Sequence, residues 1–139
     1  MKNKSLVVVL SVFSLLTAMG LSPVLAASIP QAQPDKGLMV FFRAKKAKGA
    51  ALRFQISDGT GKFLGDLSNG STFHVYLEPG QHTFKVRAPS LDGSDSVTLN
   101  LAAGEIQYLQ GEILWGWPTG RPKFNNVAEA TAKTAIQKL

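Results

Sequence analysis

Two short stretches of the sequence carry residue types that could bind a ligand. The first, RAKKAKGAALR, places four cations within six positions, at Arg43, Lys45, Lys46 and Lys48. Charges this close lie within about one Debye length, roughly 8 Å at physiological salt, so they act as one patch. Such a patch would attract the phosphates of anionic lipid, lipopolysaccharide or nucleic acid. A solvated hairpin tip that discourages edge pairing is the simpler interpretation, and we favour it from the sequence.

The second stretch, EILWGWPTGRPKF, combines Trp115, Trp117 and Arg121 with two prolines. It could form an aromatic and basic platform for a ligand. Alternatively, it is a structural corner where a strand leaves its sheet, with both indoles buried against a helix and Arg121 stacked on one of them. We favour the corner, because exposed aromatic pairs are unusual without a partner.

The groups needed for catalysis are sparse. The chain has no cysteine and only two histidines, His74 and His82, which strand alternation places on opposite faces. A nucleophile needs a base within hydrogen-bond reach, and neither histidine stands at a metal-binding spacing. Most carboxylates lie at expected turns, where they serve turn formation and solubility. The sequence therefore predicts a protein that is not an enzyme, without catalytic, cofactor-binding or metal-binding residues.

Short apolar alternations separated by glycine-rich turns must position these residues. Leu38 to Phe42 is a continuous apolar run, which is typical of a strand buried on both faces. Residues 71–87 predict a hairpin that folds back at Pro79-Gly80 and pairs Phe73 with Val86. The whole pattern predicts a mainly β fold, an antiparallel β-sandwich or open barrel of about seven short strands with a C-terminal α-helix.

The C-terminal helix is expected to begin after Asn126, because Glu129 stands three positions further on, as in a helix-starting cap. Apolar residues then recur at helical spacing and form one stripe. The stripe consists of Ala128, Ala132, Ala135, Ile136 and Leu139. We expect the tryptophan pair to pack against it.

The N-terminus has the pattern of a signal peptide. Lys2 and Lys4 precede a mostly apolar run, and small residues lead to a cleavage region at Ala26 and Ala27. An uncleaved membrane anchor is the alternative, but the apolar run is short and interrupted for a span of about 20 residues. We expect a signal peptide at 1–27, a flexible lead-in at 28–36 and one β-sandwich-like domain at 37–139, exported to the periplasm or beyond the cell. Without cysteine, packing alone must hold that domain.

Four segments carry a resemblance to a known family. The order of LSNGSTFHVYLEPGQHTFKV, LNLAAGEIQYL, GRPKFNNV and a helix ending in AIQKL resembles a bacterial family of exported proteins, domain-of-unknown-function family 2846. The resemblance covers about residues 37–139 and rests on turn signals and apolar alternation. It implies a β-sandwich-like fold in the cell envelope and supplies no activity. Many members look like lipoproteins, whereas this chain lacks the cysteine that would carry the lipid.

Charge and composition suit a binding or structural module. The net charge is +6 at pH 7, and a mild basic excess permits contact with anions without requiring it. The function we expect is an exported, non-enzymatic module of the cell envelope with a protein-interaction or structural role, and with an envelope protein as its partner. The alternative is a binder of anionic lipid or polysaccharide through the basic patch. Nucleic acid is not an expected partner.

Overall fold

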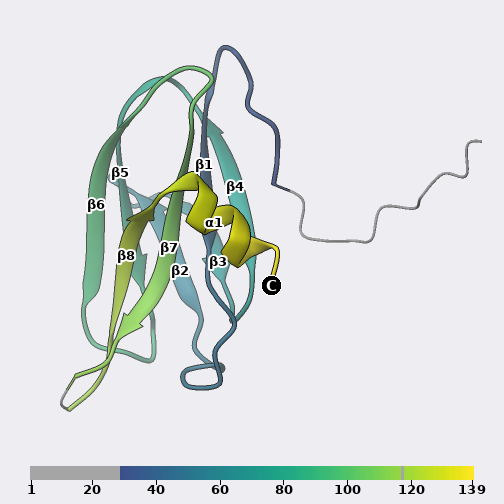
Figure 1. Ribbon diagram of the computed structural model, residues 1–139. Helices are drawn as coiled ribbons and strands as arrows, with labels where there is room; N and C mark the ends of the chain where they lie inside the picture. Colours follow the sequence, from purple (N-terminus) through teal and green to yellow (C-terminus); the bar gives the residue numbers. More distant parts are fainter. Residues whose placement is uncertain (1–28, 117) are drawn as a thin grey trace, which may run out of the picture.

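Two β-sheets packed face to face and one helix make up the fold (Figure 1). The computed structural model describes residues 29–116 and 118–139, so the predicted signal peptide lies outside the described residues. The described elements are β1 (Gly37–Phe42), β2 (Phe54–Asp58), β3 (Phe63–Leu67), β4 (Thr72–Leu77), β5 (Gly80–Arg87), β6 (Ser94–Leu101), β7 (Ile106–Leu114), β8 (Arg121–Val127) and α1 (Glu129–Ile136). They confirm the predicted mainly β sandwich with a C-terminal helix.

The first sheet has the strand order β4-β1-β7-β8. Its central strand β1 pairs antiparallel with β4 and parallel with β7. Every residue of β1 is buried, as the run from Leu38 to Phe42 predicts. Alternate residues serve two apolar clusters: Met39 and Phe41 face the second sheet, whereas Leu38 and Val40 face the helix.

Strand β8 is the element that the sequence analysis misses. A corner was expected after Trp117, but the chain returns from Arg121 as a strand antiparallel to β7. Pro122 is tolerated because β8 is an edge strand. Proline has no backbone N–H, and on the free side of an edge strand no hydrogen bond of the sheet needs one. The amide of Phe124, two positions further on, donates outside its sheet to Asp95 Oδ2 of β6 at 2.9 Å. The described residues therefore form eight strands, one more than the sequence predicts.

The second sheet has the order β3-β2-β5-β6 and is antiparallel throughout. The hairpin predicted for residues 71–87 is wrong, because β4 pairs with β1 while β5 pairs with β2 and β6. Pro79-Gly80 carries the chain from one sheet to the other, and Phe73 packs on the cluster that contains Val86 across the core. Apolar alternation specifies which face of a strand is buried, and it looks the same whether two strands share a sheet or oppose each other.

Phenylalanines dominate the core between the two sheets. The Phe41 ring stacks on Phe73 with 4.9 Å between centroids and meets Phe84 edge-on at 5.2 Å, both of which are favourable aromatic arrangements. Gly65 makes room for this packing, since a Cβ there would lie 2.7 Å from the Phe73 ring. The chain has no cysteine and cannot form disulfide bonds, so close aromatic packing holds the two sheets together.

Helix α1 covers the outer face of the first sheet (Figure 1). Ala132 and Ile136 are buried in one cluster with Tyr108 of β7, as the predicted stripe requires, whereas Ala128 is exposed. The predicted cap is wrong in its position. Asn126 belongs to β8, and the N-cap is Ala128, whose methyl side chain cannot accept a hydrogen bond.

The connections gather at the two ends of the sandwich. One end, called the opposite end below, carries the turns β2–β3 and β4–β5 and the segment that leads into β1. This segment lies against the domain, because Ile29 packs on the helix-side cluster and the Gln31 carbonyl accepts the Tyr76 hydroxyl at 2.8 Å. The predicted lead-in thus contacts the domain at Ile29 and Gln31. The other end, called the loop end, carries the connections 43–53, 68–71, 88–93 and 115–120.

Candidate functional site

Arg43, predicted as the first cation of the basic patch, is a buried structural residue. It is 4% exposed, and its guanidinium donates to the backbone carbonyls of Gly49, at 2.6 Å, and of Leu52. The guanidinium carbon lies 4.4 Å from the centroid of the Phe54 ring, which is a cation–π contact. Burial lowers the pKa of Arg43, although a guanidinium stays charged in proteins. Arg43 therefore organises the β1–β2 connection and is not free to contact a ligand.

The three lysines of the predicted patch are exposed but line different surfaces. Lys45 borders a groove of about 610 Å³ beside helix α1. Lys46 and Lys48 border a small cavity of about 60 Å³ beside the end of β7. The predicted four-cation patch therefore divides into one structural arginine, one lysine near the helix and two lysines at the loop end.

Trp115 is exposed at the loop end, where the β7–β8 hairpin extends past the other connections (Figure 1). The sequence predicts that it is buried with Trp117 against the helix. Trp115 is 44% exposed, and the helix packs on Tyr108 instead. Trp115 stands seven positions along the chain from Tyr108, about 23 Å in an extended strand, so the indole cannot reach the helix. Trp117 lies outside the described residues.

Lys48 and Trp115, which the sequence analysis assigns to separate features, meet at the loop end. The Lys48 ammonium lies 4.2 Å from the centroid of the Trp115 ring. Arg121 was predicted to stack on an indole, but the cation over the Trp115 ring is Lys48. Arg121 instead borders an open cavity of about 430 Å³ together with Trp115. We define the loop-end site as Lys46, Lys48, Leu114, Trp115 and Arg121.

Leu114 is the member of this site that the sequence analysis misses. It is the last residue of β7, pairs with Arg121 and is 57% exposed. The sequence contains a pattern that predicts the exposure of Leu114. Ile113 and Leu114 are consecutive, and neighbouring residues of a strand point to opposite faces. Ile113 packs on the core, so Leu114 has to point outward.

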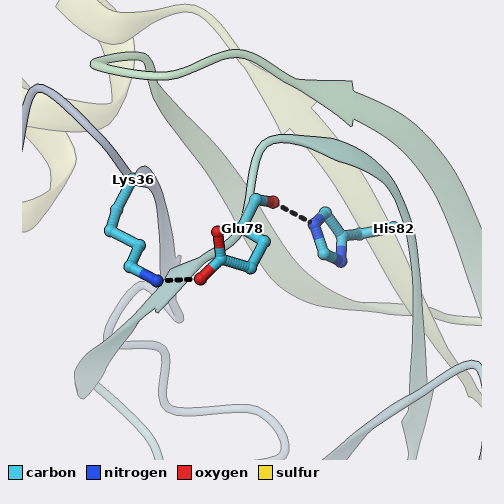
Figure 2. Close-up of polar contacts among 3 residues, drawn as sticks. All are labelled: Lys36, Glu78 and His82. Atoms are coloured by element: carbon cyan, nitrogen blue, oxygen red, sulfur yellow. Dashed lines mark hydrogen bonds and ion pairs between the residues drawn. The ribbon is translucent and has the colours of Figure 1, made fainter.

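Lys36, Glu78 and His82 form a polar cluster at the opposite end of the sandwich (Figure 2). The Lys36 ammonium pairs with the Glu78 carboxylate, and His82 Nε2 lies 2.7 Å from the Glu78 carbonyl oxygen. Because a carbonyl only accepts hydrogen bonds, Nε2 carries the proton in this contact. None of these three described residues presents a hydroxyl or thiol that a neighbouring base could activate. The cluster fastens the lead-in segment to the β4–β5 turn.

The Tyr108 hydroxyl is buried beneath α1. Among residues 29–116 and 118–139 it is the one fully buried side-chain polar atom without a hydrogen-bond partner. Burial raises the pKa of Tyr108, and the nearby Glu129 carboxylate adds to the shift. Since Tyr108 is 1% exposed, its ring serves the packing of the helix and is closed to a substrate.

Metal-ligating groups are dispersed in the part of the chain that the structure describes, where no three His, Asp or Glu side chains are placed to hold an ion. His74 is exposed on the outer face of β4, whereas His82 is half-buried beside Phe84 on the inner face of β5. Within the same described ranges, no helix combines the length and the apolarity that crossing a membrane requires.

Comparison with known proteins gives no relative. No family model matches the chain, and no significant match exists among curated proteins or solved structures. The resemblance to domain-of-unknown-function family 2846 therefore stays a prediction.

Proposed function

We propose that this protein is an exported, non-enzymatic binding module of the cell envelope and that the loop-end site is its contact surface. The observation that carries the proposal is the exposure of two adjacent apolar residues, Leu114 at 57% and Trp115 at 44%. Single apolar side chains are common on protein surfaces, but here two large exposed ones border one open cavity beside cations, which is typical of an interaction site. Here Lys48 and Arg121 supply the rim.

The groups that chemistry would need support binding over catalysis. Arg43 is engaged by two backbone carbonyls, the Glu78 carboxylate is paired with Lys36, and His82 Nε2 is bound to the backbone carbonyl of Glu78. An enzyme needs a nucleophile, acid or base that is free to meet a substrate. The export part of the proposal rests on the basic and apolar pattern of residues 1–27.

Site-specific photocrosslinking in the exporting cell tests this proposal. A photoreactive amino acid replaces Leu114 in the full chain. The matched control replaces Phe63, which is 58% exposed at the opposite end of the sandwich. We expect light-dependent adducts, to protein or lipid, from position 114 and few from position 63, in the envelope or external fraction.

Three results would contradict the proposal. Equal labelling from both positions would mean that the loop end has no special role. The absence of adducts from position 114 would remove its contact surface. A chain that stays in the cytoplasm with its first residues intact would remove the export part.

A further inference from the structure

We propose that the loop-end site docks on the surface of an anionic phospholipid bilayer. Leu114 and Trp115 enter the headgroup region, and Lys46, Lys48 and Arg121 contact lipid phosphates. This inference rests on the proposed function and names the partner of its contact surface.

The shape of the loop end favours a bilayer over a folded protein. Leu114 and Trp115 lie at the end of a hairpin that projects past the neighbouring connections (Figure 1). A stable protein interface buries about 800 Å² on each partner, more than two exposed apolar residues at the end of one hairpin supply. A fluid headgroup layer can deform around a projecting hairpin, and tryptophan favours the boundary between water and hydrocarbon.

The charges around the tip complement anionic headgroups. Lys48 stands over the Trp115 ring. Lys46 and Lys48 both border the small cavity of about 60 Å³ beside the end of β7. Arg121 and Trp115 both border the open cavity of about 430 Å³. Two carboxylates line these cavities as well. Glu112 is half-buried and accepts a hydrogen bond from the Asn125 amide at 2.6 Å, and Asp92 stands in the cavity with Arg121.

Apart from the buried Arg43, which also lines the small cavity, three cations and two carboxylates line the two cavities. Lys46 and Lys48 are both exposed, whereas Glu112 is half-buried. Each cation near an anionic bilayer strengthens binding about fivefold. Arg121 can in addition contact a phosphate with two parallel hydrogen bonds.

The placement of Lys48 disfavours a polysaccharide. Sugars are recognised by stacking on an open aromatic face, but the Lys48 ammonium occupies a face of the Trp115 ring at 4.2 Å. The same arrangement suits a bilayer, because the indole enters the interface while the ammonium above it meets the phosphates.

Two glycines hold the indole in place before any ligand arrives. A Cβ on Gly120 would lie 3.0 Å from Trp115 Cε3, and one on Gly49 would lie 3.2 Å from Trp115 Cζ2. The ring is therefore in close contact with the backbone of two connections. Less conformational freedom is lost on binding when a contact residue is already ordered.

Vesicle binding by residues 28–139, the chain left after the expected signal-peptide cleavage, tests the inference. The probes are vesicles of phosphatidylglycerol mixed with phosphatidylcholine, and vesicles of phosphatidylcholine alone, and the measured quantity is the partition coefficient from sedimentation. We expect binding to the anionic vesicles that weakens steeply with added salt. Neutralisation by Lys46→Gln and Lys48→Gln should weaken it about fivefold for each cation, and Leu114→Ser should weaken it roughly tenfold.

Matched controls lie on other surfaces of the same chain. Phe63→Ser removes an equally exposed apolar residue at the opposite end, and Lys85→Gln removes an exposed charge on β5. Both should leave the partition coefficient unchanged. Leu114, Lys46 and Lys48 are exposed, so their variants should fold, and thermal unfolding followed by circular dichroism verifies this.

Several results would overturn the inference. Equal binding to neutral and anionic vesicles would do so, as would Leu114→Ser variants that bind like the parent chain. Binding to inorganic polyphosphate that depends on the lysines but not on Leu114 would assign the site to a soluble polyanion. Protein adducts from position 114 without vesicle binding would overturn the lipid partner and leave the proposed function standing. No adducts and no vesicle binding would remove both.

Discussion

Replacing Arg43 by methionine should destabilise the domain rather than empty a ligand-binding patch. Methionine keeps an unbranched apolar stem and removes the guanidinium. The change deletes the hydrogen bonds to the carbonyls of Gly49 and Leu52 and the contact with the Phe54 ring. Both carbonyls would lose a charged donor at a site where the side chain is 4% exposed.

The size of the effect follows from two opposing contributions. A hydrogen bond from a charged donor is worth about 1.5–3 kcal/mol, and a cation–π contact about 0.5–2 kcal/mol. Against this, removing the guanidinium relieves the cost of burying a charge, which is several kcal/mol and which the lowered pKa of Arg43 reflects. We expect a net loss of about 2 kcal/mol in the free energy of unfolding, or roughly 8 °C in Tm for a domain of this size.

Urea unfolding of the full chain, followed by circular dichroism, measures this loss. Lys45→Met is the matched control, because it makes the same change of charge in the same connection at an exposed position. It should stay within about 0.5 kcal/mol of the parent chain. If Arg43→Met were as stable as Lys45→Met, the structural role assigned to Arg43 would be refuted.

Three further predictions test the packing and the electrostatics. Gly65→Ala should cost about 1–3 kcal/mol by crowding the Phe73 ring, and less in a Phe73→Leu background; equal costs in urea unfolding would argue against the contact. Asp95→Ala should lower the free energy of unfolding by about 1 kcal/mol. It should also speed hydrogen exchange at the Phe124 amide, which donates a hydrogen bond to Asp95 Oδ2 at 2.9 Å; an unchanged exchange rate would contradict this hydrogen bond between the sheets. The Thr60 hydroxyl bond, followed by the Lys62 and Thr60 amides, lowers the pKa of Asp58. A lowered folded pKa stabilises the fold above the unfolded pKa, and that stability is lost as the pH falls through the folded pKa. Thr60→Ala should therefore raise the Asp58 pKa in an NMR titration and reduce the stability that is lost when Asp58 is protonated. An unchanged Asp58 pKa would refute the role assigned to the Thr60 hydroxyl.

The sequence predicts those features of the fold that depend on local pattern. The continuous run from Leu38 to Phe42 indicates a strand buried on both faces because no polar residue interrupts it, and β1 has that environment. The spacing of Ala132 and Ile136 likewise predicts the buried side of α1. Strand partners depend on distant segments, so the pattern of residues 71–87 fits a hairpin as well as the observed crossing between sheets.

The candidate site could be predicted only in part. Arg43 looks like a member of a charge run, because its partners Gly49 and Leu52 accept only once the connection folds back over Phe54. The contact between Lys48 and Trp115 joins residues far apart in the chain through the parallel pairing of β1 with β7. No local pattern encodes that pairing, so the basic and aromatic features appear separate in the sequence.

Hydrogen–deuterium exchange of residues 28–139, with and without anionic vesicles, is a direct test of the role of the loop end. We expect slower exchange at the amides of residues 44–49 and 114–121, with unchanged exchange in the β2–β3 and β4–β5 turns. Protection confined to helix α1 or to the opposite end, with residues 114–121 unaffected, would contradict it.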